Sequence, residues 1–214
     1  MTSGDTPRLY FILDEPTLDC GRFLETMRQA IEGGVCAIQY RSKEPSTRHV
    51  LAVAEPLVHE ARRRRVSFVM NDRVDVALAL GADGVHVGED DMPVELARRM
   101  VGPASLVGAS VRTPDEARRA VDEGASYVAV GAVFPSPSKP DAPVVGLEAV
   151  ARVRAAVRVP VCAIGGISLE NVAEVVTAGA DLICVIAAIG QAPDPRQAAA
   201  DLLAAMAAAR QKAP

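Results

Sequence analysis

The sequence predicts a single (β/α)8 barrel, or TIM barrel, an α/β fold in which eight parallel strands alternate with helices. Short apolar runs rich in β-branched residues recur about every 25 residues, and each is followed by a longer amphipathic segment. The chain has 214 residues, 50% apolar and 23% charged, which suits one large core and would be cramped for two domains. We therefore expect one domain over residues 1–214, with a flexible N-terminus at residues 1–7 and a C-terminal tail at residues 208–214.

Eight segments match the pattern of a strand that is buried on both faces, because their apolar residues are not interrupted by alternating polar ones. They are residues 8–13, 35–40, 66–71, 83–88, 105–110, 126–134, 159–166 and 181–189. Helices are expected between these strands, for example at residues 46–64, 114–123, 147–156 and 169–178.

Pairs of small residues close several of the predicted helices. They are Gly33-Gly34, Gly81-Ala82, Gly124-Ala125 and Gly179-Ala180. Glycine suits the position after a last helical turn because it takes a positive φ at little cost. Repeated parallel units of this length close into a barrel. An open, doubly wound sheet is the alternative, and it is disfavoured because no GxGxxG motif follows the first predicted strand.

Composition and charge argue against nucleic acids and membranes as partners. The net charge is −4, tryptophan is absent, and no apolar run approaches the roughly 20 residues of a membrane span. The basic run at residues 62–65 is expected to be a solvated helix end, where cations complement the helix dipole. Four cysteines without metal-ligand spacing are expected to be small buried groups in a reduced, cytoplasmic protein: Cys20, Cys36, Cys162 and Cys184.

Polar residues gather where the predicted strands end, which is the rim that carries the chemistry of TIM barrels. The second, third and fourth strands lead into residues 39–43, 71–73 and 86–91, the fifth ends at Ser110, and the sixth leads into residues 136–139. The opposite ends of the strands carry mostly Gly-Ala turns and proline. We therefore expect one polar site at one end of the barrel.

Two carboxylates at adjacent strand ends, Asp72 and Asp91, suit a hard cation. Mg2+ takes one or two protein carboxylates and keeps its other positions for water and phosphate oxygens. A structural role is the alternative: Asp72 and Asp91 would then accept backbone N–H bonds as the N-caps of the helices that follow them. Their spacing alone does not decide between the two.

Positive charge and small residues at the same rim suit a phosphate ester. Arg41, Lys43 and Lys139 lie on loops that follow strands, and arginine and lysine are the usual phosphate-binding side chains. The proline-rich loop at residues 135–145 is longer than usual, which indicates a lid. After the last two strands, residues 165–166 and 187–188 are small enough for backbone N–H groups to approach an anion, although the glycines could instead serve only a tight turn.

Histidine carries no predicted role here. His86 is the one histidine at a predicted strand end, and such a residue is more often a hydrogen-bonded packing group than a proton-transfer group. His49 and His59 do not share a helical face and are expected at the surface.

Six ordered motifs resemble those of the thiamine phosphate synthase (thiamine-phosphate pyrophosphorylase) family. They are QYRSK at residues 39–43, NDR at 71–73, GVHVGEDDMP at 84–93, VGASVRT at 107–113, VFPSPSK at 133–139 and AIGGI at 163–167. The similarity extends from Arg8 to about Asp194. Six motifs in order at six strand ends are far more specific than any one of them.

The resemblance implies a role for each matching residue. An aminopyrimidine diphosphate would be held by Gln39, Tyr40, Arg41, Ser42, Lys43, Asn71, Ser110 and Lys139, with Lys43, Lys139 and Ser110 as the catalytic residues. A thiazole phosphate would be held by Ser136, Pro137, Ser138, Gly166, Ile186 and Ala187. Asp72 and Asp91 would be the ligands of the cofactor Mg2+.

The family's reaction joins 4-amino-2-methyl-5-hydroxymethylpyrimidine diphosphate to 4-methyl-5-(2-hydroxyethyl)thiazole phosphate, giving thiamine phosphate and pyrophosphate. The leaving pyrophosphate needs charge neutralisation more than the nucleophile needs a base, which fits the cations and carboxylates at this rim. Four positions or pairs depart from the family pattern: Glu89 with Asp90, Ser136 with Ser138, Arg112 and Ala187. Glu89 and Asp90 replace Gln and Glu, the two serines replace Thr, Arg112 replaces a His, and Ala187 replaces a Ser.

Two other functions remain as alternatives. A thiazole tautomerase of the same superfamily would carry a His at the position of Ala132, and retention of Asp72, Asp91 and the two lysines favours the synthase. A non-catalytic phosphate-ligand barrel is the second alternative. The partners expected are small-molecule substrates, and the sequence leaves the oligomeric state open, with a homodimer as one candidate.

Overall fold

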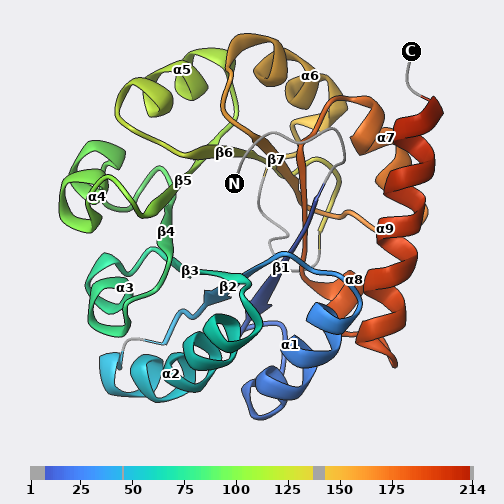
Figure 1. Ribbon diagram of the computed structural model, residues 1–214. Helices are drawn as coiled ribbons and strands as arrows, with labels where there is room; N and C mark the ends of the chain where they lie inside the picture. The colour runs from blue at the N-terminus through green and yellow to red at the C-terminus, as the bar shows by residue number, and fades with distance from the viewer. Residues whose placement is uncertain (1–7, 45, 137–142, 213–214) are drawn as a thin grey trace.

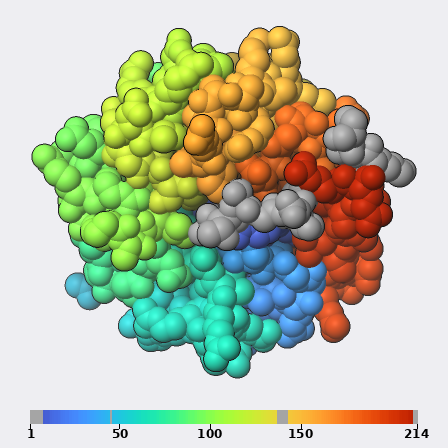
Figure 2. Space-filling view, turned by 45° about the horizontal axis from the view of Figure 1, so that its top comes forward, coloured from blue at the N-terminus to red at the C-terminus, as the bar shows by residue number. Residues whose placement is uncertain are grey.

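A closed barrel of eight parallel strands confirms the predicted fold. The computed structural model describes residues 8–44, 46–136 and 143–212, so the predicted flexible N-terminus at residues 1–7 lies outside the described part of the chain. The strands follow one another around the barrel in chain order, from β1 to β8, and β8 pairs with β1. Helices surround the strands, and segments follow one another around the outside in chain order (Figures 1 and 2).

The eight strands lie where the sequence predicts them; six are shorter than predicted, β1 is one residue longer, and β5 is shifted by one residue. They are β1 (Arg8–Asp14), β2 (Ala37–Arg41), β3 (Ser67–Asn71), β4 (Gly84–Val87), β5 (Leu106–Val111), β6 (Tyr127–Val130), β7 (Val161–Ile164) and β8 (Leu182–Val185). The sixth and eighth predictions were too long at their C-terminal ends. Apolar residues continue beyond the ladder there, and burial alone does not mark the residue at which the chain leaves the sheet.

The helices follow the predicted alternation. They are α1 (Phe23–Glu32), preceded by the 3-10 turn η1 (Cys20–Arg22), α2 (Thr47–Arg64), α3 (Val74–Leu80), α4 (Val94–Val101), α5 (Pro114–Asp122), α6 (Gly146–Ala156), α7 (Val172–Thr177), α8 (Ala187–Gly190) and α9 (Pro195–Lys212). The helix predicted at residues 169–178 begins later because residues 168–171 form a turn.

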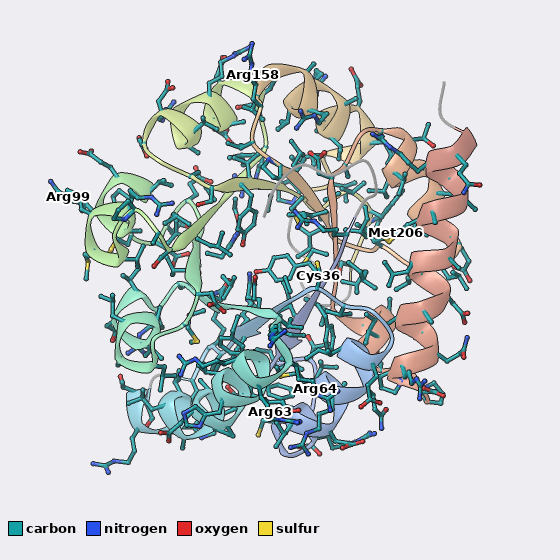
Figure 3. The ribbon with its side chains drawn as sticks, viewed as in Figure 1. Cys36, Arg63, Arg64, Arg99, Arg158 and Met206 are labelled. Atoms are coloured by element: carbon teal, nitrogen blue, oxygen red, sulfur yellow. The ribbon has the colours of Figure 1, made fainter. Side chains whose placement is uncertain are left out.

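The C-terminal segment requires a correction, because residues 208–212 belong to α9 and do not form a tail. This helix packs against α1 and α7, and its buried face includes Met206 and Ala209. Figure 3 shows Met206 pointing from α9 toward the barrel, whereas Arg99 points outward from α4. No described helix combines the length and apolar character needed to cross a membrane.

Two apolar layers stabilise the barrel. The larger one lies between the strands and the helices, and the smaller one fills the interior with Tyr10, Ile12, Ala37, Val69, Tyr127, Ala129, Cys162, Leu182 and Cys184. Cys162 and Cys184 are therefore buried packing groups, as predicted, while Cys20 and Cys36 are only half-buried. Because successive strand residues face opposite sides, all eight strands contribute to the outer layer and six of them, all but β4 and β5, also contribute buried apolar residues to the interior one.

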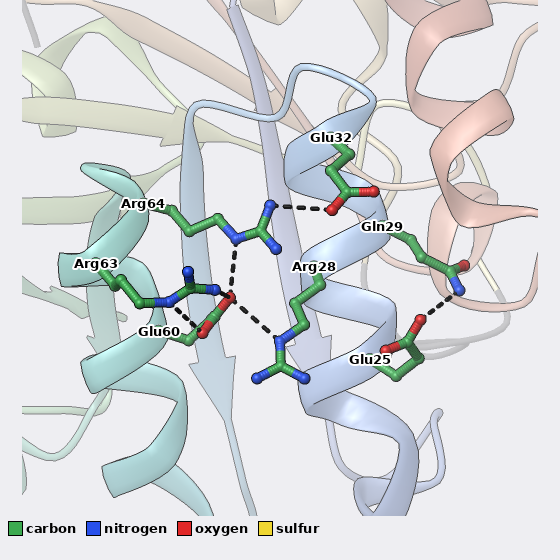
Figure 4. Close-up of polar contacts among 7 residues, drawn as sticks. All are labelled: Glu25, Arg28, Gln29, Glu32, Glu60, Arg63 and Arg64. Carbon is green, nitrogen blue, oxygen red and sulfur yellow. Dashed lines mark hydrogen bonds and ion pairs between the residues drawn. The ribbon is translucent and has the colours of Figure 1, made fainter.

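The basic run at the end of α2 is not simply solvated, which corrects the sequence prediction. Arg63 and Arg64 both donate to Glu60, which is only 6% exposed, and Arg28 of α1 donates to the same carboxylate (Figure 4). Arg64 also bonds Glu32 of α1 at 3.1 Å. The run therefore joins α2 to α1 through one nearly buried carboxylate.

Candidate active site at the barrel mouth

The ends of β2, β3 and β4 converge at the mouth, as the sequence predicts for parallel strands. Lys43 Nζ lies 3.1 Å from Asp72 Oδ2, although the two residues are 29 positions apart. The carboxyl of Asp72 in turn shares a hydrogen bond with that of Asp91. Three loops thus bring one cation and two acids together. The predicted residues Pro137, Ser138 and Lys139 lie outside the described part of the chain.

Asp72 is held by its backbone. It has a φ of 62°, in the left-handed region that aspartate tolerates better than most residues, and its N–H donates to the carbonyl of His86 at 2.8 Å. Burial raises the pKa of the Asp72 carboxyl, and the hydrogen bond with Asp91 raises it further. The Lys43 ammonium beside it acts in the opposite direction and favours the charged carboxylate.

The pKa of Asp91 shifts in the opposite direction to that of Asp72. Burial acts to raise the pKa of Asp91, but the hydrogen bond from Asp72 and that from the Gly88 N–H outweigh it, so the pKa is lowered. The bond from Gly88 N to Asp91 Oδ2 is 2.8 Å long. Neither carboxylate caps a helix, because α3 and α4 have Arg73 and Pro93 at their N-caps without side-chain bonds. The capping alternative is therefore wrong for both residues.

This donor set fits Mg2+ better than a metal that needs a complete protein cage. Two carboxyl groups lie side by side in a half-buried position, and a divalent cation would offset the repulsion between their negative charges. Among the described residues no group of three or more His, Cys, Asp or Glu side chains could hold a metal. An ion bound by Asp72 and Asp91 would therefore complete its shell with water and ligand oxygens, as Mg2+ prefers.

Arg41 is oriented by a buried acid that the sequence analysis missed. Its Nη1 lies 2.5 Å from Oδ1 of Asp14 at the end of β1, and Asp14 is fully buried while Arg41 is 12% exposed. Thr17 donates a further hydrogen bond to Asp14. The pair fixes the guanidinium at the rim and leaves its other N–H groups for an anion.

Glu15 is a second missed residue, and it organises the loop after β2. It accepts hydrogen bonds from the Tyr40 hydroxyl at 3.0 Å and from His49 Nε2 at 2.5 Å. Burial acts to raise the pKa of Glu15, but hydrogen bonds with Ser42, His49 and Tyr40 together lower it. Asp14 and Glu15 could have been found from the sequence, because they follow the first predicted strand as the other polar residues follow theirs.

Residues 39–42 divide between the interior and the outside of the barrel. Gln39 is buried inside and donates from Nε2 to the Tyr10 hydroxyl at 2.8 Å. Tyr40 faces the helices, where its ring packs edge-on against Phe23 with centroids 6.0 Å apart. The structure therefore brings Arg41 to the mouth, keeps the Gln39 side chain in the buried interior and places the Tyr40 side chain behind the mouth. Ser42 accepts from the N–H of Glu44 at 3.0 Å and shapes the loop.

The other side of the mouth offers backbone groups. Gly165 and Gly166 have φ values of 102° and 63°, and a side chain at Gly166 would collide with Pro135 and Phe134. The short helix α8 follows β8, with Ile186 at its N-cap and Ala187 as its first residue. The first N–H groups of a helix lack intrahelical acceptors, so this end suits a phosphate. Ser136 is half-buried in the loop after β6, and Asn71 is half-buried at the end of β3.

Comparison with known proteins points to one family for the whole chain. A family model described as "Thiamine monophosphate synthase" matches residues 9–189. The chain belongs to this family. It is 46% identical to a thiamine-phosphate synthase of Roseiflexus sp. over 94% of this chain and 86% of that protein. A thiamine-phosphate synthase of Chloroflexus aurantiacus is 44% identical, over 96% and 95% of the two chains. The solved structure of thiamine phosphate pyrophosphorylase from Pyrococcus furiosus superimposes with a TM-score of 0.86 and 40% identity, covering 94% of this chain and 96% of that one.

Two departures from the thiamine monophosphate synthase pattern pair with each other. Arg112 Nη1 lies 2.6 Å from Glu89 Oε2, across the loops that follow β5 and β4. Both side chains are exposed, at 47% and 71%. The negative charge that Glu89 adds beside the acidic pair is thus balanced by the cation that Arg112 adds.

Proposed function

We propose that this protein is a thiamine-phosphate synthase that joins 4-amino-2-methyl-5-hydroxymethylpyrimidine diphosphate to 4-methyl-5-(2-hydroxyethyl)thiazole phosphate. The observation that carries the proposal is the contact of Lys43 with Asp72 and of Asp72 with Asp91 at the mouth. A lysine beside a pair of acids that suits Mg2+ is an arrangement for a diphosphate. Membership of the family supports the same reaction.

The proposed binding mode divides the mouth in two. Gln39, Asn71 and Ser110 would hold the pyrimidine, and Arg41, Lys43 and Lys139 would hold its diphosphate. The thiazole phosphate would lie against Ser136, Pro137, Ser138, Gly166, Ile186 and Ala187. Both substrates are small charged phosphate esters, which fits an enzyme of the cytoplasm.

In the proposed mechanism, the bond between the pyrimidine methylene carbon and the diphosphate oxygen breaks first. Its electron pair leaves with the pyrophosphate, and the aminopyrimidine stabilises the methylene cation. The thiazole ring nitrogen then donates its lone pair to that carbon, and no proton has to be removed. Lys43 and Arg41 neutralise the leaving group, and both substrates are held in line with each other. Asp72 and Asp91 would hold Mg2+, which would supply further charge neutralisation to the diphosphate.

The alternatives find less support in the described residues. Ala132, where a tautomerase would carry a histidine, is a buried residue whose methyl group cannot move a proton. A non-catalytic barrel would have no need for two neighbouring acids beside a lysine.

The test is to mix the protein with both substrates and Mg2+ and to follow pyrophosphate release. Release that requires the thiazole phosphate is expected; simple hydrolysis would contradict the proposal.

Asp72→Ala and Asp91→Ala are each expected to abolish Mg2+-dependent turnover while the protein remains folded. Asp90→Ala is the matched control, because Asp90 is an exposed acid in the same loop, and it should keep near-normal activity. Unchanged turnover in both Asp72 and Asp91 variants would remove the metal site.

A further inference from the structure

A chain of hydrogen bonds crosses the barrel interior from the buried Gln39 to Ser110 at the mouth. Gln39 Nε2 bonds the Tyr10 hydroxyl at 2.8 Å, and this hydroxyl lies 3.2 Å from that of Tyr127. The Tyr127 hydroxyl lies 3.1 Å from His86 Nδ1, and His86 Nε2 lies 3.0 Å from Ser110 Oγ. We call these five residues the interior chain. They come from β2, β1, β6, β4 and β5.

The interior chain is buried except at its end in the mouth. Tyr10, Tyr127 and Gln39 are 1%, 0% and 3% exposed, and His86 is 8% exposed, whereas Ser110 is exposed at the rim. Burial raises the pKa of both tyrosines well above its ordinary value, so each hydroxyl keeps its proton. In this apolar interior an unpaired polar group would be costly, so each hydrogen bond constrains the next.

The Gln39 amide at one end sets the direction expected for the other hydrogen bonds, since the two hydroxyls and the imidazole can each donate or accept. The Gln39 amide donates to Tyr10, so the Tyr10 proton is used toward Tyr127, and the Tyr127 proton toward His86 Nδ1. His86 is then an acceptor at Nδ1 and a donor at Nε2, where Ser110 Oγ accepts. The Ser110 proton is therefore left to donate into the mouth, and Gln39 Oε1 is left as an acceptor.

Gly108 of β5 makes room for Tyr127 and His86 at the centre of the interior chain. A methyl group added at Gly108 would collide with the Tyr127 ring and with His86 Nδ1. The tyrosine and the imidazole thus meet over a glycine, with ring centroids 5.6 Å apart. The contact between them depends on the absence of a side chain at this position.

We infer that Tyr10, Tyr127 and His86 are positioning residues, which fix Ser110 as a hydrogen-bond donor and Gln39 Oε1 as an acceptor. The identity of the ligand in this inference rests on the proposed function. A ligand that offers both an acceptor and an N–H donor, as an aminopyrimidine does with its ring nitrogen and amino group, matches this polarity. The interior chain then selects the orientation of the pyrimidine without touching it.

The first test measures which groups donate and which accept along the interior chain. It uses the ligand-free protein and does not depend on enzyme activity. Nitrogen-15 spectra of histidine-labelled protein would show the tautomer of His86, identified among the three histidines by its loss in His86→Gln. A proton on Nε2 and a bare Nδ1 are expected in the natural sequence, and Tyr127→Phe should abolish this preference. A proton on Nδ1, or an unchanged tautomer in Tyr127→Phe, would overturn the inference.

The second test separates positioning from stability by steady-state kinetics. Tyr127→Phe and Tyr10→Phe are expected to raise KM for the pyrimidine diphosphate about three- to tenfold, the range of one neutral hydrogen bond, and to leave KM for the thiazole phosphate unchanged. Cys162→Ala is the control, because Cys162 packs in the same interior layer outside the hydrogen-bonded chain. Equal changes in all three variants, or none in the tyrosine variants, would contradict the inference. Absence of turnover in the natural sequence would instead count against the proposed function and leave the tautomer test valid.

Discussion

At the scale of single residues, the mouth depends on acids that lie behind the groups expected to touch substrate. Asp14 is fully buried and holds Arg41, while Glu15 ties Tyr40 and His49 to the same strand end. A buried carboxylate orients a guanidinium more firmly than solvent would, because neither partner can leave without exposing an unpaired buried charge. The first strand therefore contributes to the site although it offers no residue expected to touch substrate.

Asp14→Asn tests this role of the first strand. The change keeps the shape of the side chain but leaves Arg41 with a nearly buried, unpaired charge, so the free energy of unfolding should fall by about 3 kcal/mol. Urea denaturation measures the loss. Asp115→Asn is the control, because its ion pair with Arg118 is exposed and should contribute less than about 1 kcal/mol. A similar small loss in both variants would show that the Arg41 contact is not a buried ion pair.

At the scale of elements, α1 and α2 are joined at one end by the carboxylate of Glu60. Three arginines, Arg28, Arg63 and Arg64, surround this side chain (Figure 4). Their hydrogen bonds, that of Arg63 foremost, lower the pKa of Glu60 to about 2. The unfolded chain would bind a proton at this position near the ordinary pKa of glutamate, about 4.3.

The pH dependence of stability follows from this difference. A lowered pKa contributes stability that is present above the unfolded value and is lost as pH falls from about 4.3 toward 2. Between about pH 5 and pH 3, Glu60→Gln should therefore lose less of its free energy of unfolding than the natural sequence does. Glu148→Gln, which removes an exposed ion pair with Arg152 on α6, should behave like the natural sequence. Identical pH dependence in the Glu60 variant would contradict the role of the network.

At the scale of the whole molecule, closure of the barrel brings the loops of eight strands to one mouth. The acids come from the loops after β3 and β4, the arginine from β2, and the short helix α8 from the far side. A diphosphate with Mg2+ would therefore connect parts of the chain that are separate in sequence. Ligands of this kind stabilise the folded state because they bind it and not the unfolded chain.

Thermal unfolding with Mg2+ and pyrophosphate tests this connection without any reaction. The two together should raise Tm by more than the sum of their separate effects, since the ion completes its shell with phosphate oxygens; at a hundred times Kd the stabilisation is about 2.7 kcal/mol. Asp91→Asn should remove the excess, and Asp90→Asn should keep it. An equal excess in both variants would place the ion elsewhere.

The sequence by itself determined the barrel and the rim that carries the site. Repeated strand and helix patterns identify the units, and because parallel strands end at one rim, polar residues after them must gather there. The paired acids and the neighbouring lysine were found in this way. Helix α9 was missed at its end because its alanine-rich last turns carry only a weak pattern.

Only the tertiary structure decided which side of each strand faces the mouth and what lies behind it. Tyr40 and Gln39 are neighbours in sequence, yet one faces the helices and the other the interior. Tyr10 and Tyr127 are 117 residues apart and meet only because β1 and β6 face each other across a closed barrel. Sequence patterns report burial and period, whereas partners across the barrel are set by strand register and closure, which no local pattern contains.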